Sequence, residues 1–190
     1  MVAFALRADG WYLRSDCIWA KPNPMPESVT DRPTKSHEYV FLLSKSERYF
    51  YDADAVREPM AEASAERYAY AFGGAKNEHL NATVNGTAIV GMREATDGRN
   101  KRTVWSIATQ PFSGAHFAVM PEALALPCVL SGSRRGDTVL DPFAGSGTVG
   151  VVALKHGRAF IGCELNPAYA AMARERITGD APLFNVAEVA

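Results

Sequence analysis

The sequence predicts an α/β fold built on a parallel sheet, and three features of its C-terminal third carry that prediction. Two short apolar runs, 138–142 and 159–163, are typical of buried strands. A glycine-rich stretch, 143–147, follows the first run directly, and a segment with helical spacing comes after each run. Strand, loop, helix, strand and helix in this order contain a βαβ unit, whose strands run parallel and whose crossover is right-handed.

The N-terminal part predicts a helix end and two further strands. Residues 2–8 are typical of the end of a helix, with Gly10 after it. Two runs rich in aromatic and β-branched residues, 12–19 and 38–43, predict strands. Between them the prolines of 21–27 exclude regular structure and stiffen the backbone.

Three helices are expected in the C-terminal part, over 121–130, 148–156 and from 167 to about 177. Pro121 is expected to begin the first, and Pro127 to kink it. Gly157 ends the second at the position where helices favour glycine. Asn166 is a good N-cap for the third.

Composition and charge set the broad class of the protein. Of 190 residues, 47% are apolar and 22% charged, which is ordinary for a globular protein and wrong for a disordered or fibrous one. We divide the chain into 1–52, 53–105, 106–178 and a tail, 179–190. The formal net charge of −1 excludes a simple polycation, so any nucleic-acid contact must come from a local patch.

The cysteines and the apolar runs indicate a cytoplasmic protein. The three cysteines are odd in number and widely spaced, which excludes a disulfide framework and a C-x-x-C zinc site. No apolar run approaches the roughly 20 residues that a membrane-spanning helix needs, so no membrane partner is expected. His79 and His156 have no ligand-like neighbours at helical spacing, and no metal is proposed.

The glycine-rich loop predicts a cofactor site. Residues 145–150 match G-x-G-x-x-G after a strand and before a helix, and Glu164 stands at the tip of the next strand. A carboxylate at that place accepts hydrogen bonds from ribose hydroxyls. Asp141, just before the glycines, would repel a pyrophosphate but attract an ammonium group. The residues therefore favour S-adenosylmethionine over a dinucleotide, and a dinucleotide-binding oxidoreductase module is the less favoured alternative.

The motifs resemble a known family. Residues 139–148 closely resemble motif I of the DNA methyltransferases that modify exocyclic amino groups, and Phe143, Gly145 and Gly147 match its F-x-G-x-G. Residues 164–169 are similar to its motif II, whose acid holds the ribose. Residues 116–121 resemble motif X, which closes the methionine side of the pocket.

The resemblance also covers the N-terminal part. Residues 11–24 and 31–39 are similar to the segments that follow the catalytic loop of this family. The motif order, with the cofactor loop towards the C-terminal end, is that of the permuted beta class, whose members are prokaryotic or phage-encoded and typical of restriction–modification. The implied fold is a Rossmann-like class I S-adenosylmethionine-dependent methyltransferase sheet. The implied reaction is methylation of an adenine-N6 or cytosine-N4 amino group in a specific sequence of double-stranded DNA.

The resemblance implies two sets of site residues. The cofactor-binding set is Asp141, Phe143, Gly145, Ser146, Gly147, Thr148, Glu164, His116 and Phe117. Residues 53–105 stand where the family has its target recognition region, and they contain a basic stretch. The expected DNA-binding set is Lys21, Asn23, Arg93, Arg99, Lys101 and Arg102.

The catalytic motif of the family, [D/S/N]-P-P-[Y/F/W], does not occur in the sequence. Asn166-Pro-Ala-Tyr169 lacks the second proline, and Gln110-Pro-Phe112 is one residue short. No catalytic residue is therefore assigned, and the motif is expected upstream of Met1. The resemblance implies a strand order of 3-2-1-4-5-7-6, of which the chain is expected to supply strands 1, 2 and 5 onward, an incomplete sheet.

Two interpretations of this absence remain. The chain is expected to be a methyltransferase fragment that is inactive by itself. The alternative is a non-catalytic cofactor- and DNA-binding subunit of a split methyltransferase, completed by a separately encoded N-terminal fragment.

Overall fold

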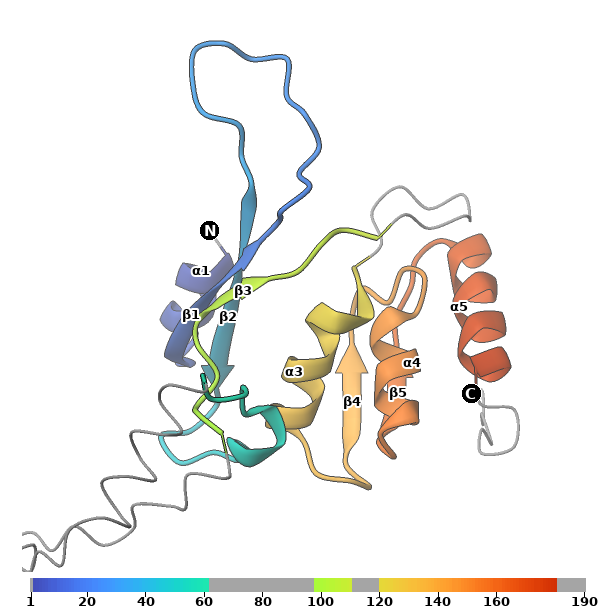
Figure 1. The fold of residues 1–190 in the computed structure, drawn as a ribbon. Helices are drawn as coiled ribbons and strands as arrows, with labels where there is room; N and C mark the ends of the chain where they lie inside the picture. Colours follow the sequence, from blue (N-terminus) through green and yellow to red (C-terminus); the bar gives the residue numbers. More distant parts are fainter. Residues whose placement is uncertain (1, 62–97, 111–119, 181–190) are drawn as a thin grey trace, which may run out of the picture.

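A computed structural model describes residues 2–61, 98–110 and 120–180 (Figure 1). The C-terminal part holds the predicted βαβ unit. Strands β4 (Thr138–Asp141) and β5 (Ala159–Gly162) pair in parallel, and helix α4 (Thr148–Lys155) connects them. Helix α3 (Glu122–Gly132) precedes the unit, and helix α5 (Pro167–Asp180) follows it.

The ends of these helices follow local capping chemistry. Asn166 caps α5 as predicted, because its Oδ1 accepts a hydrogen bond of 2.9 Å from the Ala168 amide. The helix continues to Asp180, beyond the expected end near Ile177. Pro121 is the N-cap of α3 and not its first helical residue, since its ψ of 144° is extended.

A second sheet lies in the N-terminal part of the chain. Strand β1 (Tyr12–Ala20) is central, with β2 (His37–Ser44) antiparallel on one side and β3 (Val104–Ser106) parallel on the other. Helix α1 (Val2–Ala8) packs beside β1, and a 3-10 turn, η1 (Asp54–Val56), follows the sheet. Strand β3 was not among the predicted elements, and it crosses the expected boundary at residue 105.

Strand β1 has neighbours on both sides, and its antiparallel partner β2 is the next strand along the chain. The parallel pair β4–β5 shares no strand with this sheet, so the described strands form two separate sheets. The expected supply of strands 1, 2 and 5 onward of the order 3-2-1-4-5-7-6 stays a prediction.

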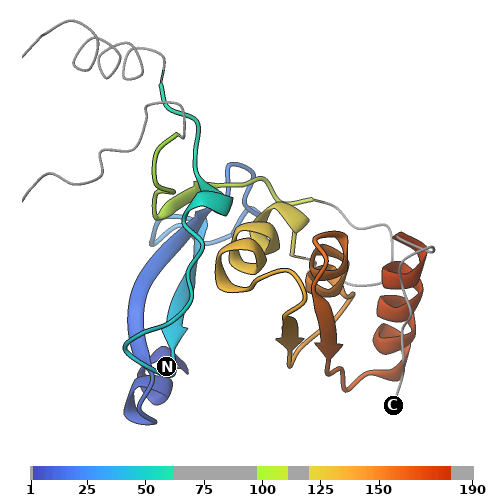
Figure 2. The same cartoon turned by 90° about the horizontal axis from the view of Figure 1, so that it is seen from below.

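The hydrophobic core lies between α3 and α4. Ala125 and Val129 of α3 pack against Val152 of α4, and Val139 of β4 contacts this cluster from the sheet. Figure 2 shows both helices on the same side of β4 and β5. Leu140 and its partner Ile161 are 61% and 55% exposed. One face of this small sheet is thus covered by helices, and apolar side chains are exposed on its strands.

Contacts at the C-terminal end of α3 join the two sheets. The Asp52 amide donates a hydrogen bond of 2.9 Å to the Ser131 carbonyl. The Arg134 guanidinium lies 4.1 Å from the centroid of the Phe50 ring, a favourable cation–π contact. In the described ranges, no helix combines the length and apolar character needed to cross a membrane.

Candidate cofactor site

The glycine-rich loop lies at the carboxyl end of β4 and leads into α4 (Figure 1). Gly147 stands immediately before α4 with a φ of 77°, a conformation that costs residues with a side chain about 1–2 kcal/mol. A Cβ at this position would lie 3.0 Å from the Ala173 Cβ of α5. The loop therefore needs glycine both for its backbone conformation and for its close approach to α5.

Glu164 lies beside this loop, as the order of the strands predicts. Its Oε2 accepts a hydrogen bond of 2.8 Å from the Gly145 amide, and its Oε1 accepts one of 2.9 Å from the Asn166 amide. These two bonds orient the carboxylate towards the loop. The loop glycines and the acid thus meet at neighbouring strand ends.

Asp141 and Phe143 shape the entrance to the loop. The Asp141 Oδ1 accepts a hydrogen bond of 3.0 Å from the Phe143 amide and so closes a tight turn after β4. The Phe143 side chain is 87% exposed, which leaves its ring accessible to a ligand. The role of Asp141 in the turn is a structural one that sequence reasoning missed.

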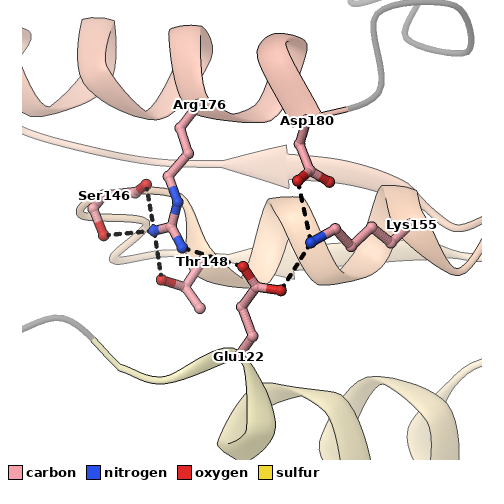
Figure 3. Close-up of polar contacts among 6 residues, drawn as sticks. All are labelled: Glu122, Ser146, Thr148, Lys155, Arg176 and Asp180. Atoms are coloured by element: carbon pink, nitrogen blue, oxygen red, sulfur yellow. Dashed lines mark hydrogen bonds and ion pairs between the residues drawn. The ribbon is translucent and has the colours of Figure 1, made fainter. Parts of the chain in front are cut away.

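Ser146 and Thr148 flank Gly147 and are buried. Their polar atoms face Arg176 of α5, whose Nη1 lies 2.9 Å from Thr148 Oγ1 and 3.3 Å from both Ser146 Oγ and the Ser146 carbonyl (Figure 3). Arg176 was not among the predicted site residues. Its helical spacing placed it on α5, but no sequence signal connects it to the loop.

Three predicted site residues lie outside the described ranges. These are His116 and Phe117 of the expected cofactor set and Arg93 of the expected DNA-binding set.

Lys21 and Asn23 bind other parts of the chain. Lys21 forms an ion pair with Glu38, and its Nζ lies 4.4 Å from the centroid of the Trp19 ring. The Asn23 Nδ2 donates to the Thr109 carbonyl (3.1 Å), and its Oδ1 accepts from the Thr109 amide (2.9 Å). These contacts hold the loop between β1 and β2 to its neighbours, a structural role compatible with contact to DNA.

The other described basic candidates converge on one carboxylate. Arg99, Lys101 and Arg102 lie 3.3, 3.9 and 2.9 Å from the Glu58 oxygens. Burial acts to raise the pKa of Glu58, but hydrogen bonds from Arg102 and the charges of Arg102 and Lys101 outweigh it and lower this pKa. Three cations against one anion leave a local positive charge of two, which suits a phosphate backbone.

Comparisons with known proteins agree with this geometry. The sequence profile of the N6/N4 methyltransferase family, described as DNA methylase, matches residues 1–175. The Type II methyltransferase M.Cfr9I of Citrobacter freundii is 47% identical over 179 residues, which are 94% of this chain and 49% of that protein. M.SmaI of Serratia marcescens is 48% identical over 176 residues, 93% of this chain and 50% of that protein. The chain spans about half the length of these curated relatives.

Solved structures give the same fold. The complex of M1.HpyAVI with SAM has a TM-score of 0.59 at 22% identity, over 92% of this chain and 67% of that one. The PvuII DNA methyltransferase, described as cytosine-N4-specific, has a TM-score of 0.61 at 18% identity, over 94% of this chain and 59% of that one. Fold, loop geometry and sequence profile agree, and the chain belongs to the N6/N4 DNA methylase family.

Proposed function

We propose that this chain binds S-adenosylmethionine and forms the cofactor-binding part of an enzyme that methylates an exocyclic amino group of adenine or cytosine in double-stranded DNA. One observation carries the proposal: the Gly145 amide lies 2.8 Å from the Glu164 carboxylate. This contact brings a glycine-rich loop beside an acid at the next strand tip, an arrangement that supports binding of an adenosine-containing cofactor. Membership of the DNA methylase family supports the assignment to methyl transfer.

Each loop residue has a separate task in this proposal. The Glu164 carboxylate accepts hydrogen bonds from the ribose hydroxyls, and the two backbone amides that it already binds keep it oriented. The Asp141 carboxylate attracts the ammonium of the methionine part. The exposed Phe143 ring offers an apolar surface. S-Adenosylmethionine supplies a methyl group on a sulfonium, and its transfer to an amino nitrogen needs mainly positioning.

DNA is the expected partner of the basic cluster around Glu58. Arg99, Lys101 and Arg102 would contact phosphates, together with Lys21, Asn23 and Arg93. A DNA substrate, with the three free thiols of the chain, favours the reducing cytoplasm of a bacterium or an infected cell as the place of action. The relatives named Type II methyltransferases favour a role in restriction–modification.

Calorimetry with S-adenosylmethionine and with NAD tests the cofactor assignment. We expect binding of S-adenosylmethionine and no binding of NAD. Glu164→Ala should weaken binding by roughly tenfold or more, because it removes the ribose acceptor and a charge-assisted bond to the loop. Glu175→Ala, on the exposed side of α5, is the matched control and should leave the affinity unchanged. NAD binding, or an unchanged affinity after Glu164→Ala, would refute the assignment.

A second candidate is a non-catalytic cofactor- and DNA-binding subunit, completed by a separately encoded N-terminal fragment. The exposed Leu140 and Ile161 on β4 and β5 favour it. Because each residue is a little over half exposed, burial of the remaining surface by another polypeptide would contribute about 1–2 kcal/mol each. Sedimentation of the chain with a family fragment that carries the catalytic tetrapeptide tests this candidate. A stable complex supports it, and two species that sediment separately contradict it.

A further inference from the structure

Arg176 links the candidate cofactor loop to two other helices. From α5 its guanidinium reaches the residues on both sides of Gly147, with bonds of 2.9 to 3.3 Å to the Ser146 carbonyl and hydroxyl and to the Thr148 hydroxyl (Figure 3). Its other terminal nitrogen, Nη2, lies 3.5 Å from the Glu122 Oε1 at the start of α3. One planar group thus contacts the loop, the first residue of α4 and the first residue of α3.

This guanidinium is a polar partner of the two hydroxyls that flank Gly147. The residue that caps α4 is Gly147, which has no side chain and makes no side-chain cap bond. The hydroxyls of Ser146 and Thr148 are buried, and buried polar groups require hydrogen-bond partners. Arg176 supplies donors to both hydroxyls and to the Ser146 carbonyl. Arg176 therefore holds the loop from another helix, α5, whereas in most helices the side chain of the N-cap residue itself makes the capping bond.

Glu122 extends the link to α3, of which it is the first residue. The ion pair between Arg176 and Glu122 therefore ties the glycine-rich loop to the start of that helix.

We propose that Arg176 is a positioning residue for S-adenosylmethionine binding, acting through Ser146, Thr148 and Glu122. The inference rests on the proposed function, because it takes the loop to be the cofactor site. Lysine would be a poor substitute at this position, since its point charge cannot donate in one plane to acceptors on three elements.

Lys155 offers a matched control within the same network. It binds the other oxygen of Glu122 at 3.0 Å and Asp180 at 3.1 Å, from the last residue of α4 (Figure 3). The bond to Glu122 raises the pKa of Lys155, so it is cationic at neutral pH. Lys155 and Arg176 therefore both bind the Glu122 carboxylate and tie helices together, but of the two it is Arg176 that also bonds to Ser146 and Thr148 of the loop.

The test compares Arg176→Gln, Arg176→Lys and Lys155→Met in the whole chain. Calorimetry gives the Kd for S-adenosylmethionine, and hydrogen–deuterium exchange of the ligand-free chain reports on the amides of residues 143–149. We expect Arg176→Gln to weaken binding about tenfold and to speed loop exchange about tenfold. Arg176→Lys should lie between Gln and wild type. Lys155→Met should leave both the Kd and the loop exchange within about twofold of wild type.

The two readouts separate the inference from the proposed function. A wild-type chain that does not bind S-adenosylmethionine refutes the proposed function, and with it the cofactor role of Arg176. Equal effects of Arg176→Gln and Lys155→Met on Kd and exchange would show that Arg176 only packs helices, and would overturn the inference. Unchanged loop exchange in both Arg176 variants would overturn it whether or not the cofactor binds.

Discussion

At the scale of single residues, the loop before α4 has no space for a side chain at Gly147. Gly147 has a positive φ, and the space where its Cβ would stand is bounded by Ala173 and Ile177 of α5, at 3.0 and 3.1 Å. Ala173 is buried, so it cannot move away from a Cβ added at position 147. The closeness of the loop to α5 also lets Arg176 reach it.

Gly147→Ala should destabilise the folded chain by at least 1–2 kcal/mol, roughly the cost of left-handed backbone for an L-residue before any clash is counted. Gly132→Ala is the control: Gly132 ends α3, its φ is not positive, and nothing lies near its absent Cβ. This change should be neutral or stabilising by up to about 1 kcal/mol. Urea unfolding of both variants measures the difference, and equal stabilities would contradict the steric argument.

A residue can be predicted from sequence where it and its partner are linked by a local pattern. Gly147 and Glu164 are predictable because each stands at a fixed distance from a recognisable strand end. Arg176 is not, because its acceptors Thr148 and Ser146 lie 28 and 30 residues away and are fixed only by the packing of α5. The ion pair between Lys21 and Glu38 likewise cannot be predicted until the pairing of β1 with β2 is known.

At the scale of elements, the strands with their own apolar pattern are predictable, and β3 is not. Three residues are too short to show a period, and β3 exists because it pairs with β1. Close to β3 the chain forms a bridge between Glu58 and Arg99. Arg99 and Arg102 both pair with the Glu58 carboxylate, so this bridge combines backbone bonds with charge.

The bridge should depend on pH through Glu58. Its pKa is lowered from an ordinary value of 4.5, so its stabilising contribution is present above about pH 4.5 and is lost as pH falls through the lowered value. Glu58→Gln should therefore be less stable than wild type at pH 7, with the difference shrinking in acid. Urea unfolding from pH 7 to pH 3 measures it. Glu47→Gln, at an exposed site, should show no such trend, and a Glu58→Gln difference independent of pH would contradict the ion-pair account.

At the scale of the whole molecule, the described strands make two sheets and not one. The parallel pair β4–β5 carries the loop and Glu164, whereas β1, β2 and β3 form the other sheet beside the basic cluster. Contacts near Phe50 and Arg134 connect the two parts. In the function that we propose, the part with β4 and β5 holds the cofactor, and the part with the basic cluster contacts DNA.

This division predicts that cofactor binding and methyl transfer are separable. The loop and Glu164 lie within the chain, so it should bind S-adenosylmethionine, whereas no tetrapeptide [D/S/N]-P-P-[Y/F/W] occurs among its 190 residues to hold a flipped base. We expect no transfer of labelled methyl groups to DNA by the purified chain, at cofactor concentrations that saturate it. Adding a family fragment that carries the tetrapeptide should restore transfer, and Glu164→Ala should lower that restored activity roughly tenfold at cofactor concentrations below saturation. Transfer by the chain alone, lost on Glu164→Ala, would show instead that other residues of this chain hold the base.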